Sequence, residues 1–324
     1  MSHLVQDVGA WPEHEEEQLG SKPKTWLRDP DSPDGPRWLW KRPRPATGEH
    51  WAELVAADIA ALLGVPHAVV RLARRGALLG TISRDFTAGR EGHAILWHGN
   101  QLLATSIHGY ARDAQKPPLH TVDAVLDYLS HPGIDPPSGL VDLQGIGTAT
   151  DAFVGYLMLD ALIGNTDRHH ENWGLLQVSR SATGDSNAGR SHVELAPSYD
   201  HASSLGRDLS DDIRRRRLAG SDPRVTVAHY CARGRTPLYG ARFDPSRGTY
   251  EASTQLTFRE AFERACDFTP KVAAVWLRHL AAVEATRLLD AIERLPAEAT
   301  SDAARAFARA VLACNREFLL SLPH

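Results

Sequence analysis

Cysteine and methionine are scarce in this chain of 324 residues, which has three of the first and two of the second. The cysteines, Cys231, Cys266 and Cys314, are odd in number, lie far apart and form no CxxC pair. This spacing excludes a disulfide framework and indicates reduced thiols. Long apolar runs are missing too, since none approaches the roughly 20 residues of a membrane span. The N-terminal residues contain no apolar signal core. We therefore expect a cytoplasmic protein with no membrane attachment.

The chain also has no large excess of positive or negative charge; its net charge is −4. Nucleic-acid-binding domains are usually basic, so direct nucleic-acid binding is not indicated. The sequence has no HExxH motif or comparable second histidine cluster, which argues against a histidine-based metal hydrolase. What is present is ordinary for a globular protein: 42% hydrophobic and 23% charged residues, in a chain long enough for one large domain or two lobes.

The residue pattern divides the chain into three parts. Residues 1–19 form an acidic leader. Residues 20–86 read as two strands, a helix over 48–64 and two more strands, which makes a small mixed β-sheet lobe. Residues 87–324 read mostly as helices. We therefore expect an α+β fold with a small mixed β-sheet N-lobe and a larger, mainly helical C-lobe.

Helical periodicity is clearest in five segments of the C-lobe. They are 121–130, 148–164, 255–268, 270–293 and 301–321. In the second segment we expect Thr150 to be the N-cap residue and apolar residues to form one face.

The densest polar run is GNTDRHHENWG, which directly follows an apolar helix pattern. It contains Asp167 and Asn172 in a D-x4-N spacing, and Asp200 ends the second of two strand-like runs that follow. This order suits phosphoryl transfer, in which a loop carboxylate orients the attacking group and accepts its proton. An amide oxygen and a second carboxylate can hold a divalent metal. His169 is a poor ligand for a hard metal ion, so we expect it to order the loop. On its own, D-x4-N is common, and such residues often only form turns.

The N-terminal half makes the combination more specific. Lys41 lies in the strand-like run RWLWKRP, and Glu53 lies on the next helix, where it can pair with the lysine. Upstream, LGSKPKTW supplies Gly20, Ser21 and Lys24, a composition that suits a turn over phosphate groups. A strand lysine, a helix glutamate, an Asp-x4-Asn loop and a later aspartate therefore occur in the order of a kinase site.

These segments together resemble the HipA-like kinase family, bacterial serine/threonine kinases often found in toxin–antitoxin modules. LGSKPKTW resembles the family's phosphate loop, WLWKRP its lysine strand, GNTDRHHENWG its catalytic loop and SYDHASSLG its metal-binding segment. The resemblance spans residues 20 to about 206. It implies a bilobal protein-kinase-like fold that uses ATP and Mg²⁺.

The resemblance also implies roles for single residues. Asp167 would be the catalytic carboxylate that positions and deprotonates the acceptor hydroxyl. Asn172 and Asp200 would hold Mg²⁺, Lys41 would contact the α- and β-phosphates, and Glu53 would orient Lys41.

The remaining nucleotide-binding residues that it implies are Gly20, Ser21 and Lys24 in the phosphate loop and, through backbone groups at the hinge between the lobes, Ile82, Arg84 and Phe86. Many members of the family carry a longer segment before the phosphate loop, whereas nineteen residues precede it here. We therefore expect a compact member limited to the kinase core. Glu17 stands where some members have a regulatory serine.

Three functions fit these residues. The first is a protein serine/threonine kinase, whose substrates include translation-related proteins and whose family implies an antitoxin partner. The second is a small-molecule kinase, because the D-x-H-x-x-N form also resembles aminoglycoside phosphotransferases, with His169 as the histidine. The third is a nucleotide-binding regulator without turnover, which the presence of all four polar elements argues against.

A run of four arginines, Arg214 to Arg217, is the other unusual feature. It fits either a site for an acidic or nucleic-acid-bearing partner or a solvated helix face paired with Asp211 and Asp212. Consecutive residues point in all directions around a helix, so the second interpretation is favoured.

Overall fold

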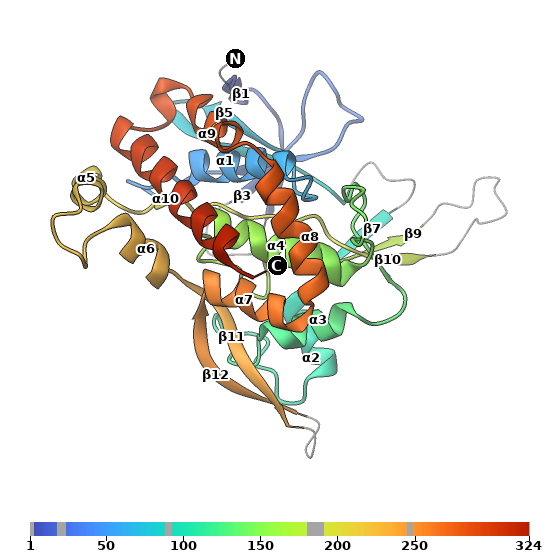
Figure 1. The fold of residues 1–324 in the computed structure, drawn as a ribbon. Coiled ribbons are helices and arrows are strands. Elements are labelled where there is room, and N and C mark those ends of the chain that lie inside the picture. The colour runs from blue at the N-terminus through green and yellow to red at the C-terminus, as the bar shows by residue number, and fades with distance from the viewer. Residues whose placement is uncertain (1–2, 18–23, 88–92, 180–190, 245–248, 324) are drawn as a thin grey trace.

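The computed structural model describes residues 3–17, 24–87, 93–179, 191–244 and 249–323. A six-stranded sheet with one covering helix forms the N-terminal part, and helices dominate the C-terminal part (Figure 1). This confirms the predicted α+β, bilobal architecture.

The N-terminal sheet has the strand order β1-β5-β6-β4-β3-β2. Its strands are β1 (Gln6–Asp7), β2 (Glu13–Glu17), β3 (Lys24–Leu27), β4 (Trp38–Lys41), β5 (Val70–Arg75) and β6 (Leu78–Arg84). Neighbouring strands are antiparallel, except that β1 runs parallel to β5. The acidic segment 1–19 therefore supplies both edge strands of the sheet. These strands lack the alternating apolar residues by which a strand is recognised in sequence.

The alternation of side chains along β4 decides which of them face helix α1 and which face the other side of the sheet. Trp38 and Trp40 are buried against Ile82 and Leu27 on one face of the sheet. Successive residues of a strand point to opposite faces, so Lys41 points to the other face. That face is covered by α1 (Glu49–Leu62).

Helix α4 (Ala149–Ile163) runs through the middle of the molecule (Figure 1). Its residues are buried on every side except at the partly exposed Asp151, and a helix that is apolar all round belongs in a core. The prediction that only one face of this helix is apolar and buried was therefore wrong. The N-cap is Thr148, not Thr150: Thr148 and Asp151 form a reciprocal capping box, and Thr150 is already inside the helix.

The other helices are α2 (Gly99–Ser106), α3 (Val122–Leu129), α5 (Asp211–Ala219), α6 (Val227–Arg233), α7 (Phe258–Phe268), α8 (Pro270–Ala282), α9 (Ala285–Glu293), the short 3₁₀ helix η1 (Ala297–Ala299) and α10 (Asp302–Ser321). The expected helix over 270–293 is in fact two, because Val283 is extended and ends α8. The helix expected from residue 255 begins at Phe258, since the preceding residues belong to a strand.

Two smaller sheets complete the C-terminal part. One has the order β7-β9-β10-β8, formed by β7 (His93–His98), β8 (Ile134–Asp135), β9 (Gly174–Ser179) and β10 (His192–Leu195). The other is a long hairpin of β11 (Arg235–Asp244) and β12 (Thr249–Thr257), which projects from one end of the molecule (Figure 1).

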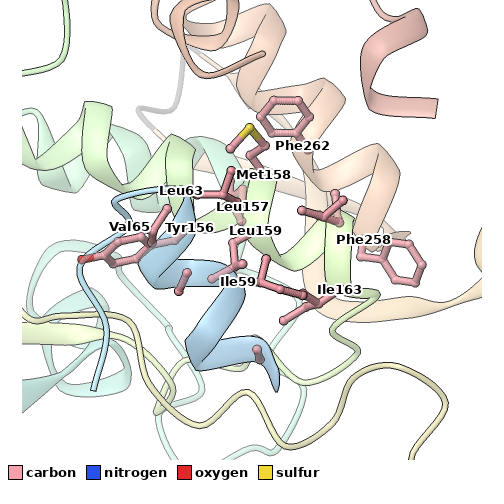
Figure 2. Packing of buried hydrophobic residues seen from close by; sticks show 14 of the residues in the cluster. Ile59, Leu63, Val65, Tyr156, Leu157, Met158, Leu159, Ile163, Phe258 and Phe262 are labelled. Carbon is pink, nitrogen blue, oxygen red and sulfur yellow. The ribbon is translucent and has the colours of Figure 1, made fainter. Parts of the chain in front are cut away.

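The main hydrophobic core is shared between the two lobes. Ile59 and Leu63 of the α1 region, Leu157 of α4, and Phe258 and Phe262 of α7 belong to the same cluster of buried side chains (Figure 2). The lobes therefore pack through side chains rather than only through a connecting segment. Within the described part of the chain, no helix is both long and apolar enough to cross a bilayer.

Candidate active site

Lys41 ends β4 beneath helix α1. Its Nζ lies 2.7 Å from Oε1 of Glu53 and 3.1 Å from Oδ1 of Asp200. Thr81, the cross-strand neighbour of Lys41 on β6, donates its hydroxyl to the other oxygen of Glu53 at 3.1 Å. Burial by itself lowers the pKa of Lys41, but the charges of Asp200 and Glu53 outweigh it, so this pKa lies above its ordinary value. Lys41 is thus an ammonium ion held between two carboxylates.

Asp200 follows β10 in a left-handed backbone conformation with φ of 59°. Few residues other than glycine adopt this conformation, and aspartate is among those that tolerate it. Burial by itself raises the pKa of Asp200, but the positive charges of Lys41 and Lys24 lower it below the ordinary value. The carboxylate is therefore ionised.

The polar loop after α4 is tied to that helix by a buried ion pair. Gly164, with φ of 66°, ends α4 and turns the chain into the loop. The guanidinium of Arg168 is fully buried and binds both carboxylate oxygens of Asp160 on α4, at 2.7 and 2.8 Å. Its Nη1 donates to the backbone carbonyl of Asn172 at 2.7 Å. Both ends of the loop are therefore fixed relative to α4.

Asp167 lies in the middle of this loop. Its backbone amide donates to Oδ1 of Asn165 at 3.1 Å, and its Oδ2 accepts a hydrogen bond from the hydroxyl of Ser203 at 3.3 Å. Burial raises the pKa of Asp167 above its ordinary value; nearby His169 opposes this effect and Asp200 adds to it.

Asn172 is buried and held by the loop itself. Its Nδ2 donates to the backbone carbonyl of Asp167 at 2.7 Å, and its backbone amide donates to the carbonyl of His169 at 2.9 Å. The amide nitrogen is thus engaged within the loop, and Asn172 is not among the residues that line the cleft described below. Asn172 and Asp200 supply only hard oxygen donors, which suits Mg²⁺. In the described ranges, no cluster of three or more His, Cys, Asp or Glu side chains has metal-site geometry.

His169 closes the turn within the loop. Its Nδ1 accepts a hydrogen bond from the backbone amide of Glu171 at 3.1 Å, and the ring is partly exposed. The contact is local and involves backbone, as a loop-ordering role requires.

A cleft brings most of these side chains together, between β4, α1, the loop after α4 and the segment after β10. We refer to it as the central cleft, lined by Lys24, Lys41, Arg42, Pro43, Arg44, Glu49, His50, Glu53, Thr81, Asp167, His169, Asp200, Ala202 and Ser203. Gly20 and Ser21 lie outside the described residues.

The hinge residues have different surroundings. The side chain of Ile82 is buried on the sheet face away from α1. The backbone amide of Arg84 already donates to the carbonyl of Val69 at 2.9 Å. The ring of Phe86 lies 5.5 Å from that of Tyr199, the residue before Asp200. Of the three, Phe86 is the one beside the rest of the site.

Several residues of the site were not found from the sequence. Arg168 and Asp160 anchor the loop, and the available signal was an aspartate inside an apolar helix, which needs a buried partner. Ser203 and Arg207 approach Asp167 from another segment, and Glu49 binds Arg207. No local pattern in the sequence marks these three residues.

The arginine run lies on α5 and is largely paired. Arg214 is buried and donates to the backbone carbonyl of Gly206 at 3.0 Å and to Asp211 at 2.8 Å. Arg215 binds Asp212 at 3.0 Å. These contacts match the interpretation of a paired helix face.

Comparisons with known proteins add information on the fold. No protein-family model matches the sequence, and no curated protein matches it. Among solved structures, the proinflammatory kinase CtkA of Helicobacter pylori matches with a TM-score of 0.64 and 18% identity, over 97% of this chain and 94% of that one.

A second match is HipA of Shewanella oneidensis MR-1, in a toxin–antitoxin complex with HipB and operator DNA. Its TM-score is 0.50 and its identity 12%, over 98% of this chain and 67% of that one. At such identities the likeness concerns the fold alone, which this chain shares with these two proteins.

Proposed function

We propose that this chain is an ATP-dependent phosphotransferase, and specifically a HipA-like protein serine/threonine kinase. The observation that carries the proposal is the bridge from Lys41 to both Glu53 and Asp200, with Asp167 in the same cleft. A buried ion-pair network of this kind needs several compensating contacts, and phosphoryl transfer requires this combination of lysine and carboxylates.

On the nucleotide side, Lys41 binds the α- and β-phosphates and Glu53 fixes its position. Lys24 lines the cleft, close enough to Asp200 to lower its pKa, and adds a second cation for phosphate groups. Gly20 and Ser21 complete the phosphate loop in this proposal. Phe86 contacts the adenine at the hinge, together with the backbone near Ile82 and Arg84.

Asn172 and Asp200 are the residues that would hold Mg²⁺. The ion would neutralise charge on the phosphate groups. The donor set fits, because both residues offer oxygen and the amide adds no further negative charge.

Asp167 acts on the acceptor. It accepts a hydrogen bond from the acceptor hydroxyl and takes its proton as the hydroxyl oxygen bonds to the γ-phosphorus and the bond to ADP breaks. The raised pKa of Asp167 brings it closer to the working pH, which favours proton transfer. His169 holds the loop in shape.

The charge around Asp167 favours a protein acceptor over a cationic small molecule. The central cleft is lined by as many cationic side chains as carboxylates: Lys24, Lys41, Arg42 and Arg44 beside Glu49, Glu53, Asp167 and Asp200. It therefore lacks the excess of negative charge that a polycationic aminoglycoside requires. The HipA structure contains HipB, and an antitoxin-like partner for this chain is part of the proposal. So are a location in the cytoplasm and a boundary between the N-lobe and the C-lobe at residue 86.

Incubation with γ-labelled ATP and Mg²⁺ tests the proposal. The wild-type chain is expected to label itself or a candidate protein such as an aminoacyl-tRNA synthetase. Asp167→Ala should still bind ATP but transfer no label. Asp212→Ala, which changes a carboxylate that is 90% exposed on α5, is the matched control and should behave as wild type. Failure of the wild type to bind ATP contradicts the proposal, and binding without transfer favours a regulator.

A further inference from the structure

The segment that follows Asp200 folds back onto helix α1. Leu205 and Gly206 both have left-handed backbones, with φ of 56° and 70°, and this reversal brings Arg207 to the first turn of α1. There Nη1 of Arg207 lies 2.5 Å from Oε1 of Glu49. The backbone carbonyl of Arg207 also accepts a hydrogen bond from the amide of Gly48 at 2.7 Å. The segment is therefore attached to the N-lobe through both its side chain and its backbone.

Glu49 is a buried carboxylate with more than one cationic partner. Its exposed fraction is 4%, and besides Arg207 it binds the backbone amide of Arg44 at 2.8 Å and Nη1 of Arg44 at 2.9 Å. A carboxylate in the first turn of a helix is further stabilised by the helix dipole. Glu49 thus provides a permanent anion between two arginines.

Ser203 connects this ion pair to Asp167. Its hydroxyl accepts a hydrogen bond from Nη2 of Arg207 at 3.1 Å and donates one to Oδ2 of Asp167 at 3.3 Å. Its backbone carbonyl accepts hydrogen bonds from both the amide and the hydroxyl of Thr166, at 3.0 and 3.1 Å. Ser203 is therefore fixed beside the loop, and its hydroxyl has one orientation that satisfies both partners.

We propose that Glu49, Arg207 and Ser203 form a positioning chain that sets the carboxylate of Asp167 relative to helix α1. The same helix carries Glu53 one turn later, and Glu53 holds Lys41. A single rigid helix thereby aligns the lysine of the N-lobe with the aspartate of the C-lobe. The three residues do not touch the reacting atoms, and their role rests on the proposed phosphotransferase function.

This arrangement also has a consequence for regulation. In many kinases an added phosphate group supplies the anion that orders the segment after the metal-binding aspartate by pairing with arginine. Here Glu49 already supplies a negative charge to Arg207. The site is therefore assembled without phosphorylation of that segment.

The first test is kinetic and uses Ser203→Ala beside the matched control Ser204→Ala. Ser204 is also buried, but its hydroxyl donates to the backbone carbonyl of His201 at 2.8 Å. Loss of one hydrogen bond to a carboxylate should lower kcat by about tenfold in Ser203→Ala. The KM for ATP should stay within about twofold, because nucleotide binding does not use Ser203. Ser203→Thr keeps the hydroxyl and should recover most of kcat.

The second test needs no turnover and measures hydrogen exchange of residues 165–173 in the chain without nucleotide. Ser203→Ala and Arg207→Lys should speed exchange in this loop, whereas Ser204→Ala should leave it as in wild type. If the wild type transfers no phosphate, the proposed function fails and the exchange result alone decides on the positioning chain. Unchanged exchange in Ser203→Ala, or an equal effect of Ser204→Ala, overturns it. An unchanged kcat in Ser203→Ala also overturns the positioning chain.

Discussion

At the scale of single residues, the buried Asp160–Arg168 ion pair is a site where a substitution is expected to destabilise the fold strongly. Both side chains are almost completely buried, and the arginine also binds the hydroxyl of Ser198 at 2.9 Å and the carbonyl of Asn172. A buried charge without its partner is strongly unfavourable, whereas replacing both partners by apolar residues often costs little. Substitutions can therefore separate the effect of this pair on the free energy of unfolding from its effect on the geometry of the loop after α4.

Arg168→Met should reduce the free energy of unfolding by about 3–5 kcal/mol, because it leaves the carboxylate of Asp160 buried and unpaired. The double variant Asp160→Leu/Arg168→Met should regain much of this loss. It should nevertheless remain inactive, since the hydrogen bond from Arg168 to the backbone carbonyl of Asn172 is lost. Urea denaturation and the labelled-ATP assay measure the two effects. A single variant as stable as wild type contradicts the assignment of this pair as an anchor.

His120 gives a prediction about pH. Its Nδ1 faces the carbonyl of Pro237 at 2.8 Å, and its Nε2 accepts a hydrogen bond from Nε1 of Trp173 at 3.1 Å, so the ring is neutral. Burial lowers the pKa of His120 to about 3. The unfolded chain binds this proton near pH 6.5. Between these values the unfolded state holds more protons, so stability falls as the pH drops.

The expected contribution of His120 to this loss is up to about 1.4 kcal/mol per pH unit below pH 6.5. His120→Asn should be less stable at pH 7, because two buried hydrogen bonds are disturbed, but its stability should fall less steeply with acid. Denaturant titrations at pH 7, 6 and 5 compare the two slopes. Parallel slopes would exclude His120 as a source of the acid sensitivity.

Sequence order was sufficient to select Lys41, Glu53 and Asp200, whose side chains the structure brings within hydrogen-bond distance. It was not sufficient for Ser203 or Arg207. Serine and arginine are common surface residues, and their significance here arises only from the fold-back that brings them to α1. Residues from distant segments that act through one another have no fixed spacing in the sequence, so no motif reveals them.

At the scale of elements, the contact between α4 and α8 depends on one residue without a side chain. A Cβ at Gly155 would lie 2.5 Å from the ring of Trp276, whose Nε1 donates to the carbonyl of Asp151 at 2.8 Å. The indole is therefore fixed by a hydrogen bond and by burial, and it has little room to move away.

Gly155→Ala should lower the free energy of unfolding by about 1–3 kcal/mol, as overpacked cores generally do. An unstrained Gly→Ala change in a helix would otherwise be stabilising by about 0.5–1 kcal/mol. Gly147→Ala is the control, because a Cβ at that position meets nothing within 4 Å. Thermal denaturation of the two variants checks the prediction, and a more stable Gly155→Ala would refute the tight contact.

Periodicity located α1, α3 and α4 within a few residues, because their apolar positions are continuous. It predicted α8 and α9 as one helix, since the apolar positions keep the helical pattern across the extended residue Val283. It missed β2, whose sequence EHEEE is polar throughout. Strands at an edge are stabilised by backbone pairing with a neighbour, and this leaves no signal in the sequence.

At the scale of the whole molecule, the two lobes share one hydrophobic core that extends from α1 to α10. Such a core is expected to break in a single cooperative step. Tryptophan fluorescence and far-UV circular dichroism should therefore give coincident urea transitions. Two separate transitions would show that the N-lobe and the C-lobe are independent folding units.

Helix α1 is also bound to residues that come late in the chain, between α9 and α10. Asp58 binds Arg294 at 2.9 Å, across 236 positions of sequence, and Nε2 of His50 meets the carbonyl of Ala299 at 2.9 Å. During synthesis, the partners of α1 leave the ribosome on the order of 10–50 s after α1 itself, at ordinary elongation rates. For that time the apolar residues of α1 have no native cover on this side. The nascent N-lobe is therefore expected to stay incompletely packed until α9 and η1 are made.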